Sequence, residues 1–201
     1  DARRVLLVEW GPLGPGVRWE HSRANLLAAI PPEFEGTVVV TGFIATDTQG
    51  LQTTLGRNGS DFSASIFGSL LDAAEIVIWT DVDGVLSADP RLVPEATVIA
   101  ALSYNEAMEL AYFGAKVLHP QTMAPAIRKR IPIRIRNTFA PERAGTVIRG
   151  EVAPHPLVKG ITTIDGIALA NLEGAGMIGV PGTAHRLFGA LREDGISVIL
   201  I

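Results

Sequence analysis

The 201-residue sequence contains no cysteine, which excludes a disulfide framework and thiolate chemistry. Its histidines are too scattered to indicate a zinc site, and they are His21, His119, His155 and His185. No apolar run approaches the roughly 18–20 residues of a membrane span, and the N-terminus lacks the basic-then-apolar pattern of a signal peptide. These absences favour a cytoplasmic protein without a metal site of its own.

Neither positive nor negative side chains strongly predominate in the sequence. The 17 Lys and Arg against 21 Asp and Glu give a net charge of −4, so we expect neither a nucleic acid nor a membrane as partner. The 47% hydrophobic content excludes general disorder and predicts an α/β protein with one full domain and a small or partial second one. The first residue is Asp1 and the last residues resemble a strand, so we expect a piece of a longer chain.

Hydrophobic patterns predict the elements of the larger domain. The apolar run 37–44 is typical of a strand buried on both faces, and 76–79 is a second strand. Between them lies a helix over 61–71 with Asn58 or Ser60 as N-cap, which predicts a right-handed βαβ unit. Ser103 and Glu106 form a capping box. Further along we expect helices at about 104–113 and 121–130, an edge strand at 131–136, and the end of the sheet near 148.

Two prolines in the segment 151–156 predict a domain boundary, with one domain over 1–150 and another over 157–201. In the second domain we expect a strand–turn–strand over 158–172, a helix over 183–194 and a strand from 196. Such a small βαβ unit buries little core alone. We therefore expect it to pack on another chain or on sequence outside this one.

Residues 53–61 combine hydroxyls, glycines, Arg57 and Asp61 immediately before a predicted helix. Glycines turn backbone N–H groups toward a ligand, and a helix N-terminus favours negative charge, so Arg57 could hold a carboxylate there. The alternative is an ordinary capped loop with a surface Arg57–Asp61 pair. The earlier glycine- and proline-rich stretch 11–16 is typical of a rigid turn rather than a phosphate loop.

Residues 80–91 follow a buried strand, at the edge where ligands of open α/β sheets bind. Asp81, Asp83, Asp89 and Arg91 could order a nucleotide with its Mg²⁺, or they could form Asx turns with solvated charges. Farther on, Lys116 is the one charge in an apolar run. It either snorkels to solvent or stabilises a transferring phosphoryl group.

These stretches together resemble aspartokinases of the amino acid kinase family, and they stand in that family's order and spacing: 54–61, 79–91 and 103–120. The runs 106–113 and 174–177 are most similar to the kinase part of bifunctional aspartokinase–homoserine dehydrogenases. The resemblance implies a three-layer α/β sandwich with a mostly parallel central sheet. The region after Val158 resembles the start of an ACT regulatory pair, which implies a partial ACT-like α+β unit.

The implied reaction transfers a phosphoryl group from ATP, with Mg²⁺, to the side-chain carboxylate of L-aspartate, and opens the route to lysine, threonine and methionine. Such a transfer needs alignment and charge neutralisation more than a general base. The resemblance implies catalytic roles for Lys116 and Asp61. It also implies that the substrate-binding residues are Gly56, Arg57, Ser60 and Asp61, and that the nucleotide-binding residues are Thr80, Asp81, Leu86, Asp89, Arg91 and Lys116.

The resemblance further implies feedback by threonine or lysine at the ACT-like part and a homo-oligomer formed through it. Two departures stand out. Residues 1–36 lack the family's Lys-Phe-Gly-Gly start, so we expect this piece to be inactive as a kinase, and Leu86 replaces the usual Tyr. No dehydrogenase segment is included in the sequence, so bifunctionality concerns only a parent chain.

Two alternatives remain open at this point. The chain could be another acyl-phosphate-forming kinase acting on glutamate or acetylglutamate, although those kinases lack the ACT extension and the 113–120 run. It could instead be a catalytically silent regulatory piece that binds an amino acid. Binding of MgATP and aspartate, compared with binding of threonine or lysine, discriminates between these functions.

Overall fold

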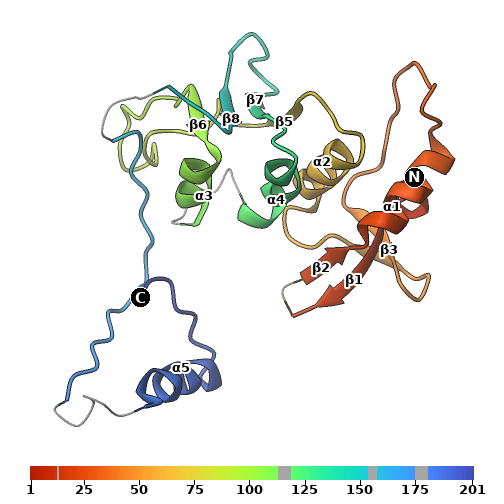
Figure 1. Cartoon of the computed structure of the whole chain (residues 1–201). Coiled ribbons are helices and arrows are strands. Elements are labelled where there is room, and N and C mark those ends of the chain that lie inside the picture. The colour runs from red at the N-terminus through yellow and green to blue at the C-terminus, as the bar shows by residue number, and fades with distance from the viewer. Residues whose placement is uncertain (13, 113–118, 154–157, 175–180) are drawn as a thin grey trace. The chain divides into compact units, whose positions relative to one another are not determined.

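A computed structural model describes residues 1–12, 14–112, 119–153, 158–174 and 181–201. The chain divides into two compact units, Asp1–Ile164 and Asp165–Ile201 (Figure 1). No helix among the described residues has the length and hydropathy needed to cross a membrane. The α/β fold expected from the sequence is confirmed, with helices packed on mixed sheets.

The first sheet of the larger unit has the strand order β2-β1-β3-β4. Its β1 strand pairs antiparallel with β2 and parallel with β3, and β3 pairs antiparallel with β4. The 11–16 turn expected from the sequence joins β1 to β2 as a hairpin. The bounds of these elements, with the short η1 helix and α1, are Ala2–Arg4 (η1), Leu7–Gly11 (β1), Gly14–Val17 (β2), Trp19–Ala29 (α1), Ile44–Asp47 (β3) and Gln52–Thr54 (β4).

The second sheet has the order β5-β7-β8-β6, in which β5–β7 and β6–β8 are parallel and β7–β8 is antiparallel. Helix α2 buries Ile66, Phe67 and Leu70 in the core of the first sheet and packs along α4 and β5. The second core lies under α3 and α4. The bounds are Gly59–Leu70 (α2), Ile76–Thr80 (β5), Ala101–Ser103 (β6), Tyr104–Tyr112 (α3), Pro120–Arg128 (α4), Ile133–Asn137 (β7) and Thr146–Arg149 (β8).

The capping box predicted for α3 is present. The Ser103 hydroxyl oxygen lies 3.2 Å from the Glu106 nitrogen and accepts its hydrogen bond, and the Ser103 N–H donates to Glu106 Oε2 at 2.7 Å. These two bonds satisfy backbone donors that lack partners at a helix start. The helix at 121–130 and the strand at 76–79 are likewise confirmed, with small shifts of their ends.

Several predictions about the strands of the larger unit are wrong. Residues 37–43 form no strand, and Val39 is 91% exposed, so this run of β-branched residues has no sheet to join. The strands before and after α2 lie in different sheets, so they form no βαβ unit. Strand β7 is not an edge strand, because it lies between β5 and β8. The pairing is accordingly mixed rather than mostly parallel.

The second unit contains helix α5 (Thr183–Glu193), as expected. The strands expected over 158–172 and from 196 onward are absent from the described residues of those stretches. None of the α5 side chains is buried, and Leu169 and Ile201 are almost fully exposed. The expectation that this small unit buries little core on its own is therefore confirmed. Residues 158–164 belong to the first unit.

Candidate functional site

The loop before α2 presents an arginine at the start of a buried helix. Leu55 is buried, Arg57 is exposed, and Asn58 takes a left-handed conformation with φ 54° as the N-cap of α2. The Asn58 side chain makes no capping hydrogen bond. The first backbone N–H groups of a helix have no intrahelical acceptor, so the turn at Ser60 and Asp61 offers donors to an anion.

Arg57 lines a hollow of about 320 Å³ that β2, α1, α2 and α4 enclose. Arg128, from the last turn of α4, lines the same hollow. Among the described residues neither arginine has an ion pair or a side-chain hydrogen bond, so the surface Arg57–Asp61 pair considered above is absent. Two uncompensated guanidinium groups at one hollow favour a ligand with more than one negative charge. The sequence analysis missed Arg128.

Asp61 lies in the first turn of α2, partly buried. Burial raises the pKa of its carboxyl above the usual value, and the Ser60 hydroxyl, which donates to Oδ1 at 3.4 Å, opposes this rise. A carboxylate with a raised pKa and a cation-lined hollow nearby is typical of functional sites, although structural groups show such shifts as well.

We expect the Asp61→Asn variant to melt at a higher temperature than the wild type near pH 7. The folded state holds a partly desolvated carboxylate there, whereas the unfolded state solvates it, so stability falls as pH rises from the unfolded pKa of 3.8 through the raised folded pKa. Below pH 3.8 both states are protonated and the difference vanishes. Thermal melts of both proteins across this range test the sign.

Asp72→Asn is the matched control for that experiment, because Lys129 lowers the pKa of the Asp72 carboxyl. Replacing the Asp72 carboxylate must therefore have the opposite effect from Asp61→Asn and reduce the stability of the protein at neutral pH. Equal melting temperatures for the wild type and Asp61→Asn at every pH would show that Asp61 carries no desolvation cost.

In the 80–91 loop, most acidic side chains are engaged. The Thr80 hydroxyl donates to Asp81 at 3.2 Å, and Asp83 accepts from Asn137 at 2.7 Å and pairs with Arg143. The Arg91 backbone N–H donates to Asp89 Oδ1 at 2.9 Å, and the two side chains form an ion pair. The Asx-turn alternative therefore describes Asp89, while Asp81 keeps acceptor capacity at the carboxyl end of β5.

Buried Thr146 fixes the middle of this loop. Its hydroxyl accepts from the Val85 N–H at 2.8 Å and donates to the Ile99 carbonyl at 2.7 Å. Gly84 has φ 143°, and a Cβ there would lie 2.5 Å from the Thr146 hydroxyl oxygen. Leu86 bridges to Val98. The loop is thus held at the start of β8 by the buried Thr146 hydroxyl and by the Leu86–Val98 bridge.

One predicted substrate residue and one predicted nucleotide residue line separate hollows. Arg57 lines the hollow beside α4, whereas Asp89 lines another of about 340 Å³. Asp81 borders neither of them. Lys116 lies outside the described residues, so the convergence of the three groups stays a prediction. Among the described residues no cluster of three or more His, Asp or Glu could hold a metal.

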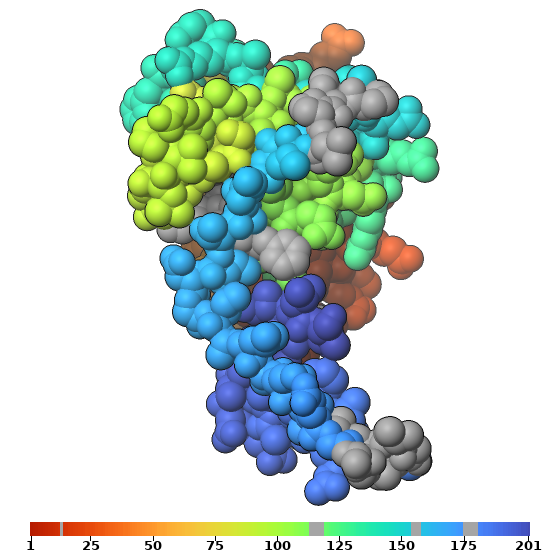
Figure 2. All heavy atoms as spheres, turned by 90° about the vertical axis from the view of Figure 1, so that its left-hand side faces the viewer, coloured from red at the N-terminus to blue at the C-terminus, as the bar shows by residue number. Residues whose placement is uncertain are grey.

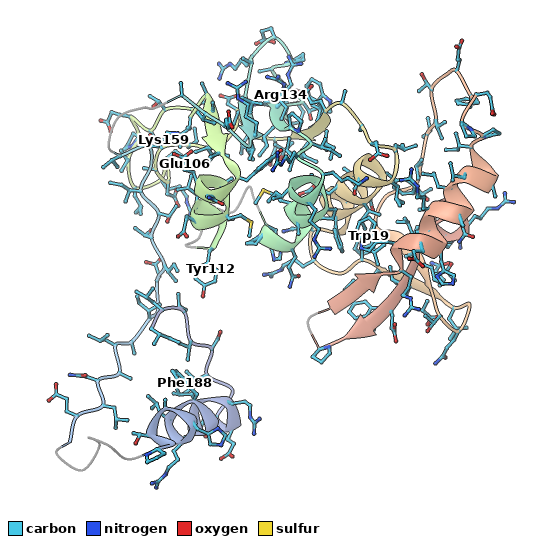
Figure 3. All side chains as sticks on the ribbon, viewed as in Figure 1. Trp19, Glu106, Tyr112, Arg134, Lys159 and Phe188 are labelled. Atoms are coloured by element: carbon cyan, nitrogen blue, oxygen red, sulfur yellow. The ribbon has the colours of Figure 1, made fainter. Side chains whose placement is uncertain are left out.

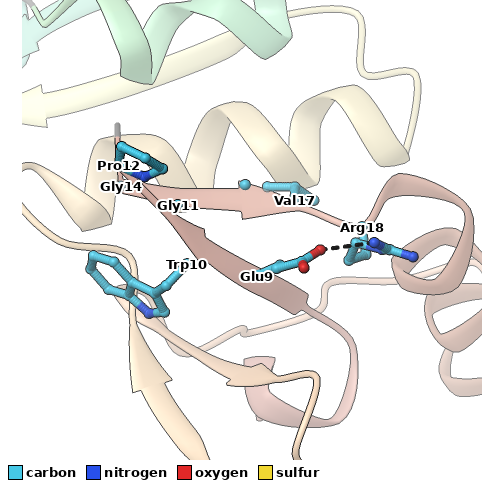
Figure 4. A pocket seen from close by; sticks show the side chains of 8 residues that line it. Glu9, Trp10, Gly11, Pro12, Gly14, Val17 and Arg18 are labelled. Carbon is cyan, nitrogen blue, oxygen red and sulfur yellow. Dashed lines mark hydrogen bonds and ion pairs between the residues drawn. The ribbon is translucent and has the colours of Figure 1, made fainter.

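A further hollow of about 400 Å³ follows the β1–β2 hairpin (Figure 4). Its charges compensate one another, because the Arg18 guanidinium donates to Glu9 at 2.8 Å. Trp10 lines it and donates its indole N–H to Thr53 at 2.8 Å. Because Arg18 is already paired with Glu9, this hollow offers an anionic ligand less uncompensated positive charge than the hollow lined by Arg57 and Arg128.

Comparison with known proteins assigns the fold. The description of the amino acid kinase family matches residues 2–137, and that of the ACT domain matches residues 171–201. The chain belongs to the amino acid kinase family. A bifunctional aspartokinase/homoserine dehydrogenase 1 of Zea mays, chloroplastic by name, is 52% identical over 170 residues, which is 82% of this chain and 18% of the relative.

Two solved structures of this family cover the whole chain. Escherichia coli aspartokinase III in complex with aspartate and ADP has a TM-score of 0.80 and 33% identity. The same enzyme in complex with lysine and aspartate has a TM-score of 0.77 and 34% identity. This chain spans 45% of each of those chains and about a fifth of the maize relative.

Proposed function

We propose that this amino acid kinase chain is part of an aspartate kinase, which transfers the γ-phosphoryl group of MgATP to the side-chain carboxylate of L-aspartate. A carboxylate oxygen attacks the γ-phosphorus, the bond to the ADP oxygen breaks, and the products are 4-phospho-L-aspartate and ADP. The observation that carries the proposal is the overlap of the whole chain with an aspartokinase bound to aspartate and ADP.

The hollow beside α2 fits the amino acid substrate. L-aspartate carries two carboxylates, and Arg57 and Arg128 bring two unpaired guanidinium groups to one hollow. In this proposal Arg57 holds a carboxylate, Gly56 and Ser60 offer backbone donors, and Asp61 orients cationic groups, including the substrate's ammonium. A dicarboxylate is favoured over a neutral amino acid, because it offers one carboxylate to each of the two guanidinium groups, which have no ion-pair partner among the described residues.

The 80–91 loop is assigned to the nucleotide. Thr80 and Asp81 contact it, Arg91 and Lys116 neutralise its phosphates, and Leu86 and Asp89 shape the loop. Mg²⁺ enters with ATP as part of the substrate, since it is commonly held by phosphates and only one or two carboxylates. The ACT-like part, from about residue 157, binds an amino acid effector, lysine or threonine, and mediates assembly of copies of the chain.

Calorimetry on the chain tests this proposal. We expect L-aspartate and MgADP each to bind with one site per chain, and L-glutamate to bind at least tenfold more weakly than L-aspartate, because an added methylene misplaces one carboxylate. A preference for glutamate or acetylglutamate would identify a different acyl-phosphate kinase. Binding of lysine or threonine without aspartate or MgADP would identify a regulatory amino-acid-binding protein.

A further inference from the structure

Residues 158–161, here called the brace, lie against the 80–91 loop within the first unit. The Ile161 N–H donates to the Ser87 carbonyl at 2.8 Å, and the Ser87 N–H in turn donates to the Thr97 carbonyl at 2.8 Å. In Figure 2 the light-blue atoms of this segment meet the yellow-green atoms of the loop. The brace therefore adds a backbone hydrogen bond to the outer side of the loop.

Lys159 joins the brace to helix α3. Its ammonium lies 2.7 Å from Oε1 and 2.9 Å from Oε2 of Glu106, and Figure 3 shows the two side chains together. The Lys159 side chain is 17% exposed, the lowest value for a cation among the ion pairs of the described residues. A partly buried pair of this kind is less screened by solvent than a surface pair.

Glu106 is also the residue that closes the capping box of α3. The hydrogen bond from the Lys159 ammonium is the largest cause that holds the pKa of the Glu106 carboxyl below its usual value, and the hydrogen bond from the Ser103 N–H is the second. The brace thus contacts the first turn of α3. The last residue of this helix, Tyr112, immediately precedes in sequence the run that contains Lys116. The brace therefore contacts both the 80–91 loop, through the Ile161 N–H, and helix α3, through Lys159.

Gly160 allows the close approach. A Cβ at this position would lie 3.3 Å from both the Ile99 Cδ1 atom and the Ser87 carbonyl oxygen, and 3.5 Å from the Leu110 Cδ2 atom. The first two distances are tighter than ordinary van der Waals contacts, so a larger residue requires a shift of a few tenths of an ångström in Ile99, the loop or the brace. Close packing at Gly160 and hydrogen bonds from Lys159 and Ile161 together hold the segment against α3 and the loop.

The loop and the brace enclose the hollow of about 340 Å³ described above. Asp89 and Leu92 line its loop side, and Lys159 and Ile161 line its brace side. Displacing the brace would therefore remove one wall of a hollow whose other wall is the predicted nucleotide loop.

We propose that the brace positions the 80–91 loop for nucleotide binding, with the Ile161 N–H holding Ser87, and that Lys159 is a positioning residue, acting through Glu106 without touching the nucleotide. The proposal rests on the assignment of this loop to the nucleotide under the proposed function. It predicts that nucleotide affinity, and not amino acid affinity, depends on the Lys159–Glu106 pair, because the hollow lined by Arg57 lies beside α2 and α4.

Calorimetry with MgADP and with L-aspartate on the chain tests the brace. Lys159→Ala is expected to weaken MgADP binding about five- to tenfold and to leave L-aspartate binding within a factor of two. Lys159→Arg should restore MgADP binding, since a guanidinium can pair with the same carboxylate. Glu106→Gln breaks the ion pair but keeps the capping box, so it should reproduce the loss in a folded protein.

Lys129→Ala is the matched control, because it removes another lysine–carboxylate pair, with Asp72, whose two residues line neither of the hollows beside Arg57 and Asp89. It should leave both affinities unchanged. Equal MgADP affinity in the wild type, Lys159→Ala and Glu106→Gln would overturn the brace while leaving the proposed function intact. A wild-type chain that binds L-aspartate but not MgADP would overturn both the brace and the assignment of the loop.

Discussion

The Gly84→Ala variant is expected to lose about 2–4 kcal/mol of unfolding free energy and most of its MgADP binding. Two causes add. Gly84 has φ 143°, a conformation that residues with a Cβ rarely adopt. The new Cβ would also lie 2.5 Å from the Thr146 hydroxyl oxygen and 3.1 Å from the Thr146 backbone nitrogen, so either Thr146 or the loop must move.

Moving Thr146 breaks two buried hydrogen bonds at once, those with the Val85 N–H and the Ile99 carbonyl. A buried polar group without a partner costs about 1–3 kcal/mol. Thr146→Val therefore serves as an independent variant: it keeps the side-chain shape, removes the hydroxyl and should lower stability by a similar amount. Thr146→Ser is the control, since it keeps the hydroxyl and should retain most of both hydrogen bonds.

Urea unfolding gives the stabilities, and calorimetry with MgADP gives the affinities. The 80–91 loop is the expected site of damage, so MgADP affinity should fall further than L-aspartate affinity in Gly84→Ala. A Gly84→Ala protein with the wild-type urea midpoint would show that the loop accommodates a Cβ, and the anchoring described for Thr146 would then be wrong.

Local signals in the sequence predict α2, α3, α4 and α5, whereas α1 was not predicted. The apolar spacing behind Asn58 predicts α2, and the Ser103–Glu106 pair predicts the start of α3, because both depend on residues within a few positions of one another. The segment 80–91 is likewise recognisable as the loop at the end of β5. Interactions within one turn can therefore be predicted from residues that are close in the sequence.

Strand pairing is not local, and there the sequence is a poor guide. Residues 131–136 alternate apolar and basic side chains, which indicates one solvated face but not the position of the strand in its sheet. In β7 the Arg134 side chain pairs with Glu75 at 2.9 Å, and Arg136 lies over the Trp79 ring at 4.8 Å. These contacts pair the basic side chains of a central strand with a carboxylate and an aromatic ring.

The same limit explains the strands that are missing. Val38 and Val39 have high β-propensity, yet a strand needs a neighbour that supplies ladder hydrogen bonds, and the pairing of β3 begins only at Ile44. In the candidate site, the sequence did not indicate that Arg128 lies with Arg57, because the two residues are 71 positions apart. Only the packing of α4 on α2 brings both to one hollow. Basic residues at a helix end are ordinarily solvated.

The Arg57→Gln variant is expected to bind L-aspartate about 100-fold more weakly than the wild type. Paired hydrogen bonds between a guanidinium and a carboxylate stabilise a complex by about 3 kcal/mol, which corresponds to roughly that factor. Protein stability should not fall, because Arg57 is exposed and, among the described residues, has no ion pair that the substitution would break.

Arg128→Gln discriminates between one carboxylate contact and two. If both arginines hold the ligand, Arg128→Gln alone also weakens L-aspartate binding, and the double variant loses less than the product of the two single losses, since the effects of residues on one ligand are coupled. L-asparagine, which lacks the side-chain charge, should then bind the wild type and one of the single variants with nearly equal affinity. Arg134→Gln, which removes only the surface pair with Glu75, is the control. Wild-type affinity for L-aspartate in Arg57→Gln would remove this hollow from consideration as the substrate site.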